Sequence, residues 1–256
     1  MDPAFVALGL LVGLLVGMTG VGAGSLVTPA LVLTGIPPAV AIGTDLAYAA
    51  VSKTAGTLAH RSQRSVDLGI AGLLALGSVP AAGLTIAVLA LSHIATRSAV
   101  VTLALAVALV LTALALLTGR ARIRSFADRY EARIAARRGA LTIVAGALLG
   151  VLVTVSSVGA GALGAVLLVA LYPDMPAVRI AGTDIAHAVP LTLIAGLGHF
   201  WLGNVDLALA ATLLAGSIPG IVAGSLLAGR LPDALVRRAL AFVLLYAGTR
   251  LAFASF

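Results

Sequence analysis

The stretch GVGAGSLVTPALVLTGIPPAVAIGTDLA, from Gly20 to Ala47, contains the two features on which the fold prediction depends. Its first part is a glycine-rich interruption of an apolar run. Its last part is the tripeptide Gly43-Thr44-Asp45, just inside the next apolar run. Both features return later, as SVGAG over residues 157–161 and as Gly182-Thr183-Asp184. The chain is therefore predicted to consist of two related halves.

The second copy follows the first at an offset of 139 positions, or 137 for the glycine-rich stretch. In the first register His60 corresponds to His199, Val66-Asp67 to Val205-Asp206, and Gly77-Ser78-Val79-Pro80 to Gly216-Ser217-Ile218-Pro219. Several matches in nearly one register indicate a duplication. We predict an N-terminal repeat over residues 1–118, a basic linker over residues 119–138, and a C-terminal repeat over residues 139–256.

The composition excludes a soluble domain. Of the 256 residues 61% are hydrophobic and only 10% are charged, whereas a soluble domain carries about 25% charged residues. Apolar runs of the roughly 20 residues that cross a bilayer recur through the whole chain. The sequence therefore predicts an all-α polytopic membrane protein.

The glycine-rich stretch divides the first apolar run of each half into two pieces of about 14 residues, which span about 21 Å and are too short to cross. Each pair is therefore predicted to be re-entrant. Three full crossings follow in each half, over residues 39–60, 67–91 and 96–118, then 178–200, 206–229 and 234–254. An odd number of crossings in each half makes the two repeats inverted.

The arginines favour this inverted arrangement. Residues 119–138 hold seven arginines against Asp128 and Glu131, which under the positive-inside rule predicts a cytoplasmic linker. The inverted arrangement brings most other arginines to the same side, with Arg97 as an exception, whereas parallel repeats would put Arg230, Arg237 and Arg238 outside. The apolar residues Ile123, Phe126, Tyr130 and Ile134 suggest a short helix on the anionic leaflet. A nucleic-acid-binding patch is disfavoured because such patches accompany a soluble fold.

The glycine-rich breaks are candidate anion sites. A broken helix offers free N–H groups and the positive end of a dipole, and transporters bind substrates at such points near the membrane midplane. The candidate substrate-binding residues are Gly20, Gly22, Gly24, Ser25, Ser156, Ser157, Gly159 and Gly161. A second interpretation, in which these small residues only allow close helix packing, stays open.

Ionisable residues within the apolar runs are candidates for proton coupling or gating. Asp45 and Asp184 are repeat-related and could equally be helix N-caps. Lys53, the only lysine, either draws an anion inward or snorkels to the interface, and Thr192 replaces it in the second copy. His187 lies one turn after Asp184 as a candidate relay partner, and Tyr48 takes its position in the first copy.

The sequence contains no pattern typical of an enzyme. It has no cysteine, its four histidines are not at metal-ligand spacing, and no Ser-His-Asp grouping occurs. The Gly-x-Gly-x-Gly run does not follow a strand and is not a dinucleotide site. We therefore expect neither a metal nor a cofactor.

The residues of the first copy, GVGAGSLVTPAL (20–31), GIPPAVAIGTDL (35–46) and Val66-Asp67, resemble the sulfite exporter TauE/SafE family of sulfite- and sulfonate-permease-like transporters. The second copy repeats the pattern at 157–163 and 176–184, without a counterpart of Pro29. Ala23 also interrupts the usual run of glycines. The resemblance implies export or uptake of sulfite, thiosulfate or organosulfonates across the bacterial inner membrane.

Together these observations predict a secondary transporter of a small sulfur-containing anion that works by alternating access, with a proton as a candidate coupled ion. Two alternatives remain. An anion channel would use the same breaks without saturation or coupling, and a non-transporting membrane subunit would belong to a larger complex.

Overall fold

The computed structural model describes residues 2–19, 24–62, 65–92, 98–227 and 233–254. Within these ranges every regular element is an α-helix and no strand occurs, which confirms the all-helical prediction. The helices are α1 (Pro3–Thr19), α2 (Gly24–Leu33), α3 (Pro38–Ser62), α4 (Leu68–Ser92), α5 (Ser98–Thr118), α6 (Arg120–Arg129), α7 (Glu131–Ser156), α8 (Ala162–Leu171), α9 (Ala177–Trp201), α10 (Leu207–Leu227) and α11 (Asp233–Ala254).

Several of these helices are long and apolar enough to cross a membrane. Within the described ranges they are α4, residues Ala99–Thr118 of α5, α7, α9 and α10. Helices α3 and α11 are similarly long, with 25 and 22 residues, but contain charged side chains such as Lys53 and Arg237. Large apolar side chains, including Leu84, Leu91 and Leu226, are exposed on the outside of the bundle, as expected where lipid replaces water. The chain is thus a multi-pass membrane protein.

Three of the four helices that flank the breaks are too short to cross a bilayer, as the sequence predicts, and their re-entrant arrangement stays a prediction. Helices α1, α2 and α8 have 17, 10 and 10 residues. Helix α7 is different, because its 26 residues suffice to cross a bilayer, and the predicted length of about 14 residues is wrong for it. The arginine- and alanine-rich end of the linker has high helix propensity, so the helix starts at Glu131 and passes through a kink at Arg137.

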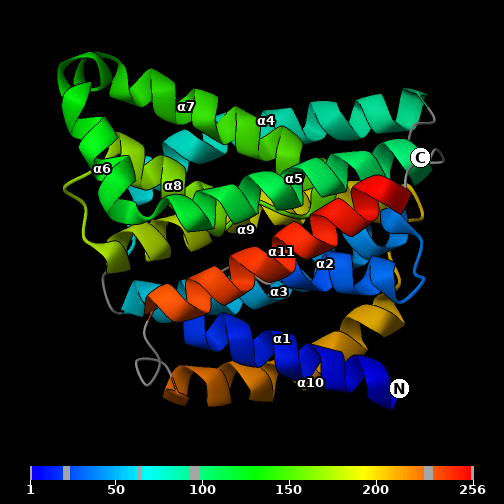
Figure 1. Cartoon of the computed structure of the whole chain (residues 1–256). Helices are drawn as coiled ribbons and strands as arrows, with labels where there is room; N and C mark the ends of the chain where they lie inside the picture. The colour runs from blue at the N-terminus through cyan, green and yellow to red at the C-terminus, as the bar shows by residue number, and fades with distance from the viewer. Residues whose placement is uncertain (1, 20–23, 63–64, 93–97, 228–232, 255–256) are drawn as a thin grey trace.

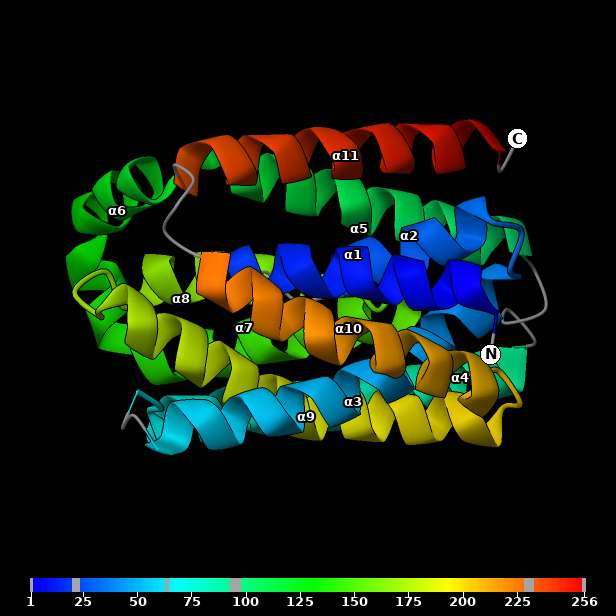
Figure 2. The same ribbon diagram turned by 90° about the horizontal axis from the view of Figure 1, so that it is seen from below.

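Eight of the helices associate in pairs. Helix α1 packs along α10, α4 along α7, α3 along α9, and α5 along α11 (Figure 1). Figure 2 shows the α5–α11 and α3–α9 pairs on opposite sides of the molecule. In the proposed register α1 corresponds to α7 and α4 to α10, so these pairs join elements of different halves.

Close backbone contact holds α1 against α10. A Cβ atom on Gly13 would collide with the carbonyl of Ser217, and one on Gly220 would collide with the carbonyl of Leu10. Small residues bring helix backbones together in this way in membranes, where apolar lipid gives little driving force for association. The α4–α7 pair has the same kind of contact at Gly77 and Gly146.

The predicted basic linker forms α6 and the first turns of α7. Its apolar side chains do not share one face, because Ile123 is buried against α8 whereas Phe126 is 62% exposed and lies 4.9 Å from the ring of Tyr130. Arg124 pairs at 3.2 Å with Asp174, in the turn between α8 and α9. Figure 1 shows α6 at the end of the molecule opposite the two termini.

Candidate functional site

The second glycine-rich break is an interruption between α7 and α8. Residues Ser157, Gly159 and Gly161 have positive φ angles of 57°, 117° and 124°, which no α-helix tolerates. The Ser156 hydroxyl accepts a hydrogen bond from the Val158 N–H at 3.1 Å and donates to the Leu152 carbonyl. Ser156 therefore stabilises the end of α7. In the first half α1 ends at Thr19 and α2 begins at Gly24, and the candidates Gly20 and Gly22 lie outside the described residues.

The two intramembrane carboxylates face the start of the short helices after the breaks. Asp45 accepts a hydrogen bond from Thr28 of α2 at 2.5 Å, and a Cβ on Gly24, the first residue of α2, would lie 3.3 Å from its Oδ2. Asp184 faces the N–H of Gly161 at the start of α8 and lies directly against Gly164. Neither carboxylate caps its own helix, because α3 and α9 begin two turns earlier. The N-cap interpretation of Asp45 and Asp184 is therefore wrong.

Lys53 reaches from α3 into the second break. Its ammonium donates to the carbonyl of Ala160 at 3.2 Å. The side chain therefore turns inward, and the snorkelling interpretation is wrong. The ammonium is close enough to interact with the charges of Asp45 and Asp184, although it forms none of the ion pairs found among the described residues. Thr192, its counterpart, donates to the Ala188 carbonyl of its own helix at 2.8 Å.

His187 and Tyr48 occupy matching positions one turn after the carboxylates. His187 Nε2 lies 3.0 Å from the Ser78 hydroxyl of α4, and Tyr48 faces Ser217, the counterpart of Ser78, on α10. Both side chains are buried. No hydrogen bond joins His187 to Asp184 among the described residues, so their relay pairing stays a prediction.

These side chains form what we name the buried polar cluster, which consists of Thr28, Asp45, Tyr48, Lys53, Ser78, Ser157, Asp184, His187 and Ser217. Six polar atoms of the cluster are buried without a hydrogen-bond partner in the described part of the chain: Asp45 Oδ1, Tyr48 Oη, Ser157 Oγ, Asp184 Oδ1, His187 Nδ1 and Ser217 Oγ. A buried polar atom without a partner costs about 1 to 3 kcal/mol. Because so many unpartnered polar atoms lie in one region, this region is suited to bind and release a polar ligand.

Ser25, the remaining predicted site residue, is buried at the start of α2. The sequence prediction missed Thr28, Ser78 and Ser217 as cluster members. The repeated Gly-Ser-x-Pro pattern could have indicated the two serines. For Thr28 the second copy gives no signal, because Ala165 stands at the matching position.

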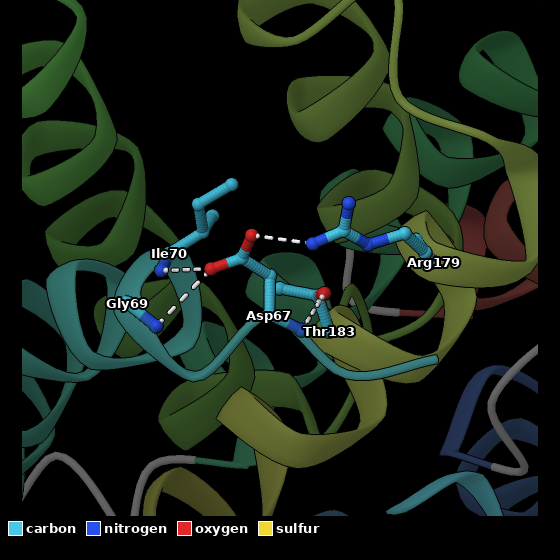
Figure 3. A network of polar contacts seen from close by, with 5 residues as sticks. All are labelled: Asp67, Gly69, Ile70, Arg179 and Thr183. Atoms are coloured by element: carbon cyan, nitrogen blue, oxygen red, sulfur yellow. Dashed lines mark hydrogen bonds and ion pairs between the residues drawn. The ribbon is translucent and has the colours of Figure 1, made fainter. Parts of the chain in front are cut away.

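The prediction also missed two junctions between the halves. At the Asp67 junction, shown in Figure 3, Thr183 accepts a hydrogen bond from the Asp67 N–H at 3.0 Å, and Asp67 pairs with Arg179 at 2.8 Å. The other oxygen of Asp67 accepts from the N–H groups of Gly69 and Ile70 and thereby caps α4.

At the Asp206 junction, Thr44 accepts from the Asp206 N–H, also at 3.0 Å, and Asp206 caps α10 through the Leu209 N–H. Each Thr of a Gly-Thr-Asp tripeptide thus binds the Val-Asp motif of the other half. The repeated motifs were the available signal for both junctions.

Comparison with known proteins identifies the family. Residues 5–251 match the model of a family described as "Sulfite exporter TauE/SafE". The chain is also 37% identical over 262 residues to "Probable membrane transporter protein YjnA" of Bacillus subtilis (strain 168), covering 98% of this chain and all of that protein. No solved structure matches the chain. Both likenesses are to membrane transporters rather than enzymes, and the chain belongs to the sulfite exporter TauE/SafE family.

Proposed function

We infer that this chain is a secondary transporter that moves sulfite, or a related small sulfur-containing anion such as thiosulfate or an organosulfonate, across the bacterial inner membrane. The family description supports the substrate class. The observation that carries the proposal is the placement of Asp45 and Asp184 at the starts of α2 and α8, around the only lysine of the chain.

The start of a helix attracts anions through its free N–H groups and its dipole. In the described conformation two protein carboxylates lie at these positions, and among the described residues Lys53 alone brings a positive charge to the cluster. A substrate anion that approaches two ionised carboxylates in a dry interior would be repelled, because like charges are poorly screened there. Protonation of one carboxylate leaves a single ionised carboxylate, whose charge Lys53 balances. A proton therefore accompanies the anion.

Lys53 acts as the fixed cation of the site. Its hydrogen bond to Ala160 holds it at the second break, where Ser157 and the start of α8 supply further donors. When an anion binds, the ammonium exchanges the neutral carbonyl for a charged acceptor, which makes a stronger hydrogen bond. The orphaned hydroxyls of Ser157, Tyr48 and Ser217 complete the candidate donor set.

Alternating access is carried by two inverted repeats in this proposal. The exchange of partners between halves supports it, since α1 packs on α10 while α7 packs on α4. The two threonine contacts follow the same rule: Thr183 of the second half accepts from Asp67 of the first, and Thr44 of the first half accepts from Asp206 of the second. The arginines of α6 support a cytoplasmic position for the linker.

The test is sulfite flux in proteoliposomes under an imposed pH gradient, with sulfate and thiosulfate as competitors. We expect saturable sulfite movement that follows the pH gradient and is inhibited more by thiosulfate than by sulfate. Empty liposomes and the Lys53→Gln variant are the controls. Linear flux without gradient coupling would indicate a channel, and no flux in vesicles that contain folded protein would contradict the proposal.

A further inference from the structure

We propose that the Asp67 junction and the Asp206 junction are the two gates of the transport path, and that Arg179 is a latch that holds the Asp67 gate closed. In this scheme each Gly-Thr-Asp tripeptide couples one gate to the buried polar cluster. The inference rests on the transport function proposed above.

The glycine of each tripeptide makes the junction tight. A Cβ on Gly182 would collide with the backbone carbonyl of Ser65, and a Cβ on Gly43 would collide with that of Asn204. In both places the segment that approaches belongs to the other half. Ser65 is only 4% exposed beneath this contact. The closest approach at each junction is thus between backbones, with the Ser65 hydroxyl beside Gly182 and the His199 side chain beside Gly43.

The threonine of each tripeptide bonds the same segment. The Thr183 hydroxyl accepts a hydrogen bond from the N–H of Asp67, and the Thr44 hydroxyl accepts one from the N–H of Asp206, each at 3.0 Å. Both threonines are fully buried. Opening a junction therefore breaks a buried hydrogen bond, which gives the gate two distinct states rather than a continuum.

The aspartate of each tripeptide belongs to the buried polar cluster. Asp184 follows Thr183 directly, and Asp45 follows Thr44, so about 1.5 Å of helix rise separates a gate contact from a cluster carboxylate. A change of charge or hydrogen bonding at the carboxylate displaces the same turn of helix that holds the gate. Because the threonine and the aspartate are neighbours in the helix, a change at the cluster is transmitted directly to the gate.

The two junctions lie at opposite ends of the path. Gly43 and Thr44 are near the start of α3, whereas Ser65 and Asp67 follow its end, so most of the 25-residue helix lies between them, roughly 27 Å along its axis. The Asp67 junction is at the end that includes α6, because Arg124 of α6 pairs with Asp174 just before α9. Alternating access needs a closure at each end.

Among the described residues, an ion pair occurs at the Asp67 junction and not at the Asp206 junction. Arg179 contacts Asp67 at 2.8 Å, with side chains that are 47% and 28% exposed, and Val40 stands at the matching position in the other half. Figure 3 shows the guanidinium on one carboxylate oxygen while the other oxygen caps α4. Arg179 therefore adds an ion pair to the Asp67 gate that the described residues of the Asp206 gate do not have.

The chain has no cysteine, so a single Ser65→Cys reporter gives a labelling assay without background. The assay uses the purified full-length chain in detergent micelles, with no anion added, and a hydrophilic maleimide. The labelling rate of a buried thiol follows the population of the open state. Because an exposed or half-exposed ion pair is worth up to about 1 kcal/mol, we expect Arg179→Gln to speed labelling roughly two- to fivefold.

The matched control is Arg124→Gln, which removes the ion pair with Asp174 at the same end of the molecule without touching the junction. It should leave the labelling rate of Ser65→Cys unchanged, and Arg179→Lys should restore most of the slow rate. Thermal unfolding midpoints establish that all variants are folded. Thr183→Val provides a second gate variant, also with faster labelling, if Arg179→Gln does not fold.

Equal rates in Arg179→Gln and its parent, or an equal acceleration in Arg124→Gln, would overturn the latch. These readouts need no substrate. A failed flux experiment with sulfite would therefore leave the gate result standing, and a failed labelling experiment would leave the flux result standing.

Discussion

At position 184 the chain brings a carboxylate against the first turn of α8, and no hydroxyl of that helix binds it. Asp45 differs, because Thr28 donates to it at 2.5 Å. In the second half Ala165 stands where Thr28 stands in the first. Oδ1 of both carboxylates is buried without a hydrogen-bond partner in the described part of the chain, so the two differ in the hydrogen bond that the Thr28 hydroxyl donates to Asp45 alone. Of the two carboxylates, Asp184 is therefore the better candidate for the coupled proton.

The Asp184→Asn substitution tests this role. It removes a negative charge that competes with the anion, and two like charges about 4 Å apart repel by about 1 to 4 kcal/mol at effective dielectric constants of 80 to 20. We expect the KM for sulfite at neutral pH to fall at least about fivefold, and flux to lose its dependence on the pH gradient. Proteoliposome flux at several pH values measures both.

The control for this substitution is Asp174→Asn, at an aspartate whose side chain is 95% exposed and outside the cluster. It should leave both KM and the pH response as in the parent. If Asp184→Asn keeps gradient-driven flux, the coupled proton is carried elsewhere.

Sequence reasoning found the ionisable residues but not their partners. Asp45, Lys53, Asp184 and His187 stand out because charged or titratable groups are costly in an apolar run. The partner of Lys53 is a backbone carbonyl more than a hundred residues away, and every residue has such a group. No sequence pattern therefore indicates it.

Among the elements, the break between α7 and α8 is the one that the sequence indicated best. Glycines at residues 159 and 161 allow the positive φ angles that the interruption needs. The length of α7 was not indicated, because the charge of the linker suggested a separate segment, whereas the helix runs from Glu131 to Ser156 with a kink at Arg137, next to the predicted end of the linker. Charge identifies the side of the membrane on which a segment lies, but it does not end a helix.

The Gly161→Val substitution tests the break as an element. A β-branched residue at φ 124° is strained by about 1 to 3 kcal/mol and would reshape the start of α8. We expect sulfite flux to fall at least about tenfold while the protein still inserts into the membrane. Flux and the amount of membrane-integrated protein are the two measurements.

Gly119→Val is the matched control. Gly119 also has a positive φ, of 70°, but it precedes α6 and a Cβ there would meet no atom within 4 Å. The Gly119→Val variant has the same kind of backbone strain without contact to the cluster. Its sulfite flux should equal that of the parent protein. Comparable flux in the two variants would count against a role of the break in binding.

For the whole molecule, helices occur at all six predicted crossings, and the family prediction is confirmed. Within the described residues α4, α5, α9 and α10 are long and apolar enough to cross a membrane, whereas crossing by α3 and α11 stays a prediction. Hydrophobic run length and repeated motifs suffice for this level of description. The pairing of α1 with α10 and of α4 with α7 depends on glycine faces meeting across the halves. Apolar periodicity carries little information about such contacts in lipid.

Sidedness is tested with single cysteines in the cysteine-free chain. Ser125, exposed on α6, should react with a membrane-impermeant thiol reagent only from the cytoplasmic side. Asn204, in the turn before α10, should react only from the opposite side. Labelling of intact cells and of inverted vesicles compares the two, and reaction of both positions from one side would reject the inverted arrangement.

The exchange of contacts between the Gly-Thr-Asp and Val-Asp motifs also bears on the ancestry of this chain. Two identical half-length chains, inserted in opposite directions, would form the same contacts as an antiparallel homodimer. Gene duplication and fusion then join such a pair without changing the interface. Lys53 and Arg179, whose counterparts are Thr192 and Val40, would be differences acquired once the two copies were free to diverge. On this history the differences between the two halves arose after the fold.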